Sequence, residues 1–246
     1  MVTDIVAKRP VSRLNGWHRT QRSLEKLRVE MGNRKSALDR GVDTAEGETE
    51  DYYERLNVAL EGFEREAETL MAAELVHYPV WDFWLRHVKG IGDGLSAQLL
   101  SMLLPPIPEK AVSSWYKAGG LAPEVLENGE THLPRARAGQ DGLSYYPWLR
   151  RCLYNVATSF VRNGGYYRQV YEQEKERFQL QHGGDWLPIR IDRVARWRTI
   201  KLFLSHLWDA WCECENIPAR RKPWIIEYGG HTTLIERHLP DGKGKI

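Results

Sequence analysis

The stretch that decides the fold is HVKGIGDGLSAQLL, residues 87–100. Its centre, Gly90-Ile91-Gly92, separates the apolar run VWDFWLRHV from a second segment with helical character. Glycine permits backbone angles that other residues avoid, and it presents no Cβ to an approaching molecule. The pattern, with Val88 before the turn, predicts a helix-hairpin-helix in which Ile91 anchors the turn between the two helices.

This turn has two interpretations. The backbone N–H groups at the start of the second helix form an anion site, so the turn would hold a nucleic-acid phosphate. Asp93 would cap that helix or repel the phosphate, and Lys89 partly offsets its charge. Alternatively, the turn only lets two helices pack. On the first interpretation, the DNA-binding residues of the turn are Lys89, Gly90, Ile91, Gly92 and Gly94.

Composition limits the class of protein. The chain has 246 residues, of which 42% are hydrophobic and 28% charged, and its net charge is only +2. A core of ordinary size is expected, and any nucleic-acid surface must be a local patch. No apolar stretch is long enough to cross a bilayer, and the start lacks the apolar segment of a signal peptide. We therefore expect a cytoplasmic protein with no membrane partner.

Metal and cofactor sites are not indicated. The three cysteines give no disulfide framework, and the Cys212-x-Cys214 pair lacks a second close pair of zinc ligands. The chain has neither a P-loop nor a dinucleotide fingerprint, because G-I-G-D-G follows a helical pattern and not a strand. We expect no metal, no cofactor and no small-molecule substrate.

Helical periodicity extends along most of the chain and predicts an all-α fold. A basic block between Lys8 and Lys35 contains a helix over about 18–31, and an acidic amphipathic helix covers about 49–76. Further helices cover about 147–178, with a break at Gly164-Gly165, and about 190–214, which is apolar enough to be central in the core. The predicted organisation is an N-terminal arm and acidic helix over 1–78, a multi-helical domain over 79–235, and a disordered tail over 236–246.

Other basic residues are candidates for phosphate contact. Two lie in a polar, glycine-containing loop, two begin the next helix beside Trp148, and three surround Trp197. Basic side chains interleaved with aromatic ones are typical of nucleic-acid surfaces. Equally, acidic residues of the 49–76 helix would neutralise those around Trp197 inside the fold. The candidates are Arg135, Arg137, Arg150, Arg151, Arg193, Arg198 and Lys201.

The order of segments resembles a known family. The G-I-G turn, the spacer LLPPIPEK, an aromatic-rich segment ending in GLAP and the run LRRCLYNVA follow one another between about Val88 and Phe160. This order resembles the C-terminal domain of insertion-sequence transposases of the bridge-RNA recombinase family. The later stretch RWRTIKLFLSHLWDAW with ENIPARRKPWIIEYGGHTTLI resembles the tail of stand-alone relatives of that domain.

The resemblance implies DNA binding, and for the complete family also catalysis. Members carry an N-terminal RNase H-like domain with a set of acidic residues and a nucleophilic serine in the loop after GLAP. Residues 1–75 lack the alternating strands and helices of such a domain, and Asn128-Gly129 stands where the family tends to have Ser-Gly. An amide cannot replace a hydroxyl nucleophile. Ser144 remains the one catalytic candidate, if the loop is aligned differently.

Three functional hypotheses follow. The first is a transposase-related DNA-binding protein, with RNA as another possible ligand, that has no catalysis of its own and grips the backbone with little base reading. The second is an active recombinase that uses Ser144 and carboxylates from a partner. The third is a protein-interaction module in which the 49–76 helix binds a transposase or a second copy.

Overall fold

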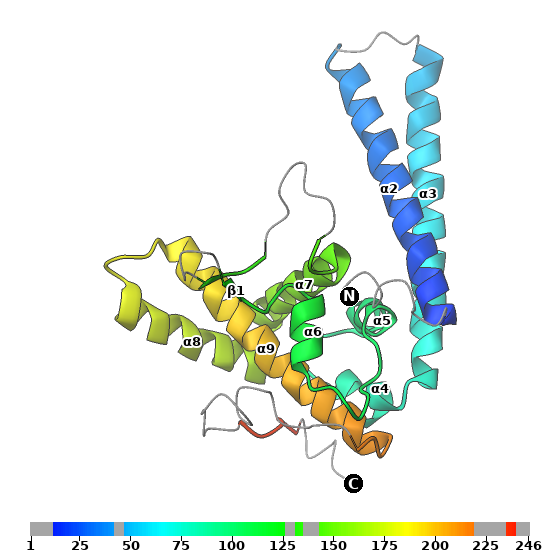
Figure 1. Ribbon diagram of the computed structural model, residues 1–246. Helices are drawn as coiled ribbons and strands as arrows, with labels where there is room; N and C mark the ends of the chain where they lie inside the picture. Colours follow the sequence, from blue (N-terminus) through cyan, green and yellow to red (C-terminus); the bar gives the residue numbers. More distant parts are fainter. Residues whose placement is uncertain (1–11, 42–46, 126–130, 135–142, 219–234, 240–246) are drawn as a thin grey trace. The chain divides into compact units, whose positions relative to one another are not determined.

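The computed structural model describes residues 12–41, 47–125, 131–134, 143–218 and 235–239, and it confirms the all-α prediction (Figure 1). The α-helices are α2 (Arg13–Asp39), α3 (Gly47–Glu74), α4 (Pro79–Phe83), α5 (Asp93–Met102), α6 (Ser113–Ala118), α7 (Pro147–Asn163), α8 (Tyr166–His182) and α9 (Pro188–Cys214). Short 3-10 helices cover Leu75–His77 and Leu85–His87. A small antiparallel pair, β1 (Glu124–Val125) and β2 (Thr131–His132), was not predicted.

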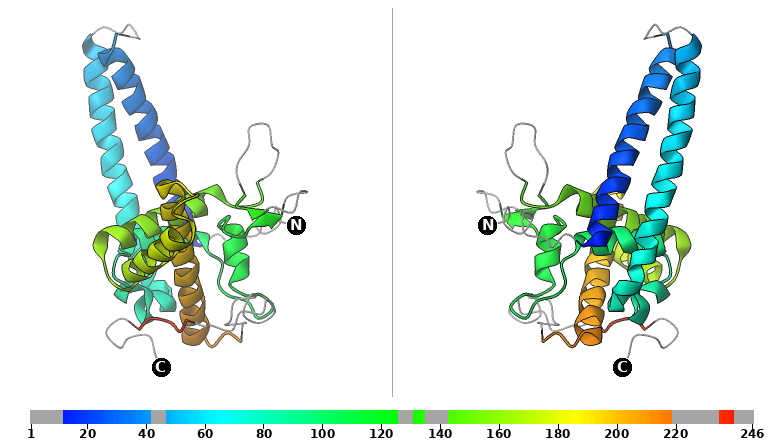
Figure 2. Two further views of the ribbon diagram at one scale, coloured as in Figure 1. Left: turned by 90° about the vertical axis from the view of Figure 1, so that its left-hand side faces the viewer. Right: turned by 90° about the vertical axis from the view of Figure 1, so that its right-hand side faces the viewer.

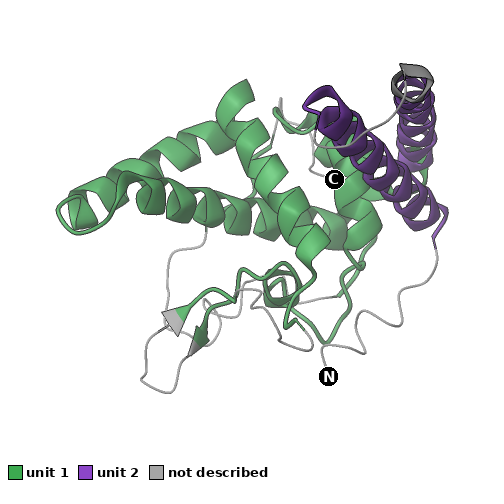
Figure 3. Cartoon of the chain, turned by 90° about the horizontal axis from the view of Figure 1, so that it is seen from above, with its two compact units in different colours: residues 1–10, 76–246 green, residues 11–75 purple. Residues whose placement is uncertain are grey.

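The chain divides into two compact units (Figure 3). The smaller unit is Val11–Leu75, and the larger is Val76–Ile246 together with the first ten residues. Within the described ranges, no helix has both the length and the apolar character needed to cross a membrane.

The smaller unit is a helical hairpin in which α2 and α3 lie side by side (Figure 2). Its packing comes from apolar residues of α3, since Leu60, Ala67 and Met71 are buried. The apolar side of the predicted amphipathic helix, to which Tyr52 and Phe63 belong by their helical spacing, is only partly internal, since these two residues are 55% and 56% exposed.

Ion pairs connect the basic block of α2 to the acidic surface of α3. Arg28 Nε donates to Glu64 Oε1 at 2.8 Å in a partly buried position, and this hydrogen bond raises the pKa of Arg28. The other two pairs are Arg13–Glu74 at 3.2 Å and Lys35–Glu54 at 2.9 Å. Part of the basic block is therefore engaged in ion pairs within the hairpin. Exposed ion pairs of this kind each contribute about 0.2–1 kcal/mol to the stability of the fold.

The core of the larger unit surrounds α9, as the apolar sequence of this helix predicts. The Phe203 ring lies 5.2 Å from Phe160 of α7, 5.3 Å from Tyr167 of α8 and 5.9 Å from Trp84, measured between ring centroids. Aromatic pairs at such distances stabilise a core by about 0.5–1.5 kcal/mol each beyond area burial. Figure 1 shows α8 and α9 as a second helical hairpin, with α7 packed against both.

The helix predicted before the glycine turn is broken. It ends at Phe83, and Trp84, with φ −144° and ψ −47°, leads into a single 3-10 turn. The Trp84 side chain is fully buried, and its Nε1 donates to the carbonyl of His238 at 2.8 Å. The α-helix gives way to a 3-10 turn at the residue whose indole is bound by this distant carbonyl and packed in the aromatic core.

Residues 235–239, four of which begin the predicted disordered tail, form a strap on the larger unit. The Arg237 side chain is 5% exposed and donates to Asp209 Oδ2 at 2.8 Å and to Glu213 Oε2 at 2.6 Å, both on α9. The His238 ring stacks on Tyr166 at 4.2 Å. Two ion pairs to α9 and one stacked ring on α8 therefore hold the strap in place.

His206 connects the strap to the core. Its Nδ1 lies 2.8 Å from the Tyr167 hydroxyl and its Nε2 lies 3.3 Å from the Ile235 carbonyl. Because a carbonyl only accepts, the neutral ring carries its proton on Nε2 and accepts from Tyr167 through Nδ1. Burial lowers the pKa of His206 to about 4.

We predict that this histidine makes the fold acid-sensitive. An unfolded histidine has a pKa of about 6.5, so the unfolded state gains a proton before the folded state as the pH falls. The stabilisation is complete above about pH 6.5 and is lost toward pH 4; between pH 7.5 and pH 5 the free energy of unfolding should fall by about 2 kcal/mol from this residue. Urea unfolding of the wild type and His206→Gln at both pH values measures this difference. An equal pH dependence in the two proteins would contradict the prediction.

Candidate nucleic-acid interface

The glycine turn has the predicted arrangement around its apolar anchors. Val88 and Ile91 are buried, and the Ile91 N–H donates to the Val88 carbonyl at 3.2 Å. Gly92 has extended backbone angles and is the N-cap of α5, while the Ser96 N–H donates to its carbonyl at 2.9 Å. Asp93 is therefore the first residue inside the helix and not its cap.

Gly90 is required by packing. Its φ of +95° lies in the left-handed region, and a Cβ there would be 3.0 Å from Phe160 Cδ1 and 3.4 Å from Phe160 Cα. Both the backbone angle and the close approach of α7 exclude a larger side chain. Gly90 thus allows the turn before α5 to pack closely against Phe160 of the aromatic core.

Gly92 and Gly94 have the opposite environment. Both are exposed, and a Cβ on either would meet no atom within 4 Å. The first N–H groups of a helix have no partner within it, so the start of α5 offers donors where a phosphate can approach. The exposed Asp93 carboxylate lies in the same turn and opposes an anion there.

A second glycine corner lies against this turn. Gly164 and Gly165, with φ of +78° and +88°, carry the chain from α7 into α8. A Cβ on Gly165 would be 3.0 Å from Lys89 Cβ and 3.3 Å from its Cδ. The Lys89 stem therefore crosses the corner at Gly165, and Lys89 is an exposed residue.

From this corner, α7 presents a basic surface. Arg151, Asn155 and Arg162 are exposed and spaced by four and seven residues, which places them on one stripe of the helix. The helix sequence PWLRRCLYNVATSFVRN contains no aspartate or glutamate. Sequence analysis missed Arg162, although its spacing from Arg151 and the absence of acidic residues were available as signals.

Arg150, next in sequence to Arg151, is half-buried and makes contacts within the protein. Its Nη1 donates to the carbonyl of Pro134, and its guanidinium lies 4.9 Å from the centroid of Tyr145 and 5.8 Å from that of Trp197. A Cβ on Gly120, within GLAP, would lie 3.2 Å from this Nη1. Arg150 therefore joins α7 to the segment at Pro134 and lies close to Gly120 of the GLAP segment.

The candidates on α9 differ in exposure. Arg193 and Arg198 are exposed, whereas Lys201 is half-buried and burial lowers its pKa. Arg193 and Lys201 lie four residues to either side of Trp197, whose ring is 6.2 Å from that of Tyr154 on α7. This contact brings the basic part of α9 beside α7. Arg196, in contrast, forms an ion pair of 2.8 Å with Asp192, four residues earlier on the same helix.

Ser144 donates its hydroxyl to Glu124 Oε1 at 2.6 Å. Glu124 belongs to β1 and is opposite His132 of β2 in the register. The hydrogen bond joins the segment before α7 to the short strand pair. Arg135 and Arg137 lie outside the described residues.

The described residues contain no group of three or more histidine, cysteine, aspartate or glutamate side chains that could hold a metal ion. Cys212 is buried and Cys214 is half-buried. Burial raises the pKa of Cys214 to about 12 and that of Cys152 also to about 12. Both thiols are therefore protonated at neutral pH and are poor ligands and nucleophiles.

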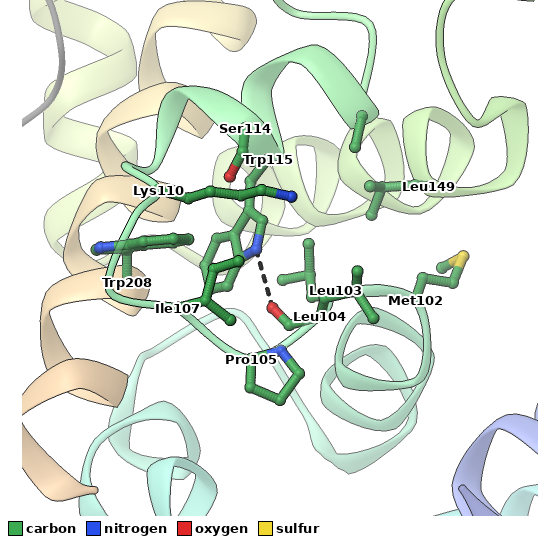
Figure 4. Close-up of a pocket in the computed structure, with 11 residues that line it drawn as sticks. Met102, Leu103, Leu104, Pro105, Ile107, Lys110, Ser114, Trp115, Leu149 and Trp208 are labelled. Carbon is green, nitrogen blue, oxygen red and sulfur yellow. Dashed lines mark hydrogen bonds between the residues drawn. The ribbon is translucent and has the colours of Figure 1, made fainter. Parts of the chain in front are cut away.

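A small cavity lies under the proline-containing connection between α5 and α6 (Figure 4). Its volume is about 70 Å³, and its walls are mainly apolar, with Trp115 held by a hydrogen bond of 3.0 Å from Nε1 to the Leu104 carbonyl. Figure 4 shows Lys110 lying across one side. Pockets for small-molecule ligands usually measure roughly 300–1,000 Å³, so this cavity suits no ligand of that size.

No protein-family model matches this chain, and no curated protein sequence matches it either.

Proposed function

We propose that this protein binds DNA through its phosphate backbone and is related to transposases of the bridge-RNA recombinase family. The glycine turn and the basic surface of α7 form the binding surface. Of the basic residues of α9, the exposed Arg193 extends it and the half-buried Lys201 contributes less, whereas the guanidinium of Arg198 lies 5.8 Å from the Phe178 ring of α8 and so contributes from the α8 side. Phosphate contacts of this type hold the duplex without reading its sequence.

One observation carries the proposal: the open end of the glycine turn and the basic stripe of α7 meet at one corner. Lys89 crosses Gly165 there, and the exposed Arg162 lies three residues before Gly165, in the last turn of α7. Open glycines, helix N-termini and the exposed arginines of α7, a helix whose own sequence contains no aspartate or glutamate, together suit a polyanion. Asp93 is the exception, and it reduces the affinity for phosphate.

The proposal includes no catalysis by this chain. In the described part of the chain, Ser144 has a carboxylate as its hydrogen-bond acceptor and no group of metal-binding residues beside it. A carboxylate can act as a base, so a serine-dependent recombinase is the enzymatic alternative. Covalent trapping on supercoiled DNA by the wild type, abolished in Ser144→Ala, would support that alternative.

Protein association through α3 is a second candidate function. Besides Tyr52 and Phe63, Val58 is 61% exposed on this helix. Tyr52 and Phe63, eleven residues apart, share one side of α3, whereas Val58 lies on another side; a contiguous exposed apolar patch is what marks an interaction surface. A partner transposase or a second copy would cover them, and light scattering of the wild type and Phe63→Glu would detect the second copy.

The two kinds of glycine in the turn should respond differently to substitution. Gly92→Ala/Gly94→Ala should remain folded, because both positions are open, and should bind a 20-base-pair duplex about tenfold more weakly at low salt, about 1.4 kcal/mol. Gly90→Ala should lower the free energy of unfolding by about 2 kcal/mol or more, through strain and contact with Phe160. Fluorescence anisotropy at several salt concentrations, with duplex and branched DNA and matched RNA, and denaturant unfolding measure the two effects.

Gly62→Ala is the matched control, since Gly62 is also open but lies on the acidic helix. It should bind DNA as the wild type does. Wild-type binding that is insensitive to salt, or a double variant that binds as tightly as the wild type, would refute the role of the turn.

Asp93→Asn should bind DNA more tightly, by about three- to tenfold at low salt, because it removes a negative charge from the start of α5. The same change should reduce stability by about 0.3–1 kcal/mol, since an acidic residue in the first turn favours the helix dipole. The difference in affinity should shrink as salt rises, and anisotropy titrations at low and high salt test this. An unchanged affinity would place the phosphate elsewhere.

A further inference from the structure

The surface of α7 carries two exposed aromatic rings as well as its basic residues. Trp148 is 36% exposed and Tyr154 is 47% exposed, and each lies three residues from Arg151. The guanidinium of Arg151 is 5.6 Å from the centroid of the Trp148 ring. Six residues of helix separate the two rings by about 9 Å along the axis and by about 120° around it, with Arg151 between them, so a strand that contacts both must cross the helix obliquely.

Tyr154 is supported from below. Its ring lies 6.2 Å from that of Trp197 on α9, with an angle of 55° between the planes, and the Arg196 guanidinium lies 6.0 Å from its centroid. Trp197 itself is half-buried and adjoins Arg150. The tyrosine is therefore held in place by α9 while almost half of its surface stays accessible.

The charge around these rings favours a polyanion. No aspartate or glutamate occurs in α7, and Asp192, the acidic residue of the first three turns of α9, accepts from Arg196 at 2.8 Å and from Tyr171 at 2.5 Å. Aromatic faces beside arginine suit nucleobases joined by phosphates. The bases of an intact duplex are stacked on one another and show only their edges, so ring-to-base stacking requires unpaired nucleotides.

We propose that α7 binds a single-stranded segment of nucleic acid, with bases stacked on Trp148 and Tyr154 and a phosphate at Arg151. This inference rests on the proposed function and names its substrate: unpaired nucleotides beside a backbone-bound duplex. The shared chemistry is a base with its phosphate, and DNA and RNA are its two sources.

The test compares 12-nucleotide oligo-dT, 12-nucleotide oligo-rU and a 12-base-pair duplex by fluorescence anisotropy at fixed salt. Trp148→Leu/Tyr154→Leu should lose about tenfold or more in affinity for a single strand and less than about twofold for the duplex, because stacking on a ring contributes about that much per base. Trp148→Phe should retain most single-strand affinity, and Tyr52→Leu, which removes an exposed ring from the acidic helix, should match the wild type. Comparing the affinities for oligo-dT and oligo-rU shows whether the single strand is DNA or RNA.

A second measurement does not depend on the double variant folding. A strand containing 2-aminopurine should lose fluorescence on binding the wild type, through stacking on the rings, and Trp148→Leu should reduce this loss. Equal losses of affinity for strand and duplex in the double variant, or undiminished strand binding, would overturn the inference, whereas duplex binding by the wild type would still support the proposed function. Absence of binding to all three probes would instead overturn the proposed function as well.

Discussion

The larger unit depends on the contact between Gly90 and Phe160. A Cβ at this position would be strained by the φ of +95° and crowded by α7, because Phe160 Cδ1 is 3.0 Å from where that atom would be. On its other sides the Phe160 ring adjoins Tyr167 at 4.7 Å and Phe203 at 5.2 Å. One aromatic side chain thus joins the glycine turn, the start of α8 and the centre of α9. Through it, the open glycines of the turn are held beside the basic surface of α7.

The same chain uses its arginines in two ways. Arg150, Arg196 and Arg237 have partners inside the larger unit: a carbonyl, a carboxylate of the same helix and two carboxylates of α9. Arg28 does so in the smaller unit. Exposed arginines such as Arg151 remain at the surface of α7 and suit the proposed phosphate contacts. A net charge of +2 therefore conceals a local surface without acidic side chains on α7.

The strap over α9 shows how a few polar contacts connect distant parts of the sequence. Arg237 is nearly buried between Asp209 and Glu213, and the His238 carbonyl accepts from Trp84, 154 residues earlier. Removing one partner of a buried ion pair commonly costs about 3–5 kcal/mol, because the other charge is left uncompensated. The indole held by this strap interrupts the helix before the glycine turn, so the strap and the turn belong to one packed structure.

The sequence by itself determined the class of fold and most of the long helices. Apolar spacing and the glycine pair at 164–165 predicted α3, α7, α8 and α9 closely, because helical periodicity and helix ends are set by neighbours a few residues apart. The packing of distant segments decided that Gly90 is needed for packing while Gly92 is open, that Arg150 is half-buried and bonded to Pro134 while Arg151 is exposed, and that the helix ends before Trp84. Each of these outcomes depends on a residue far away in the sequence, Phe160, Pro134 or His238, whose position no local pattern contains.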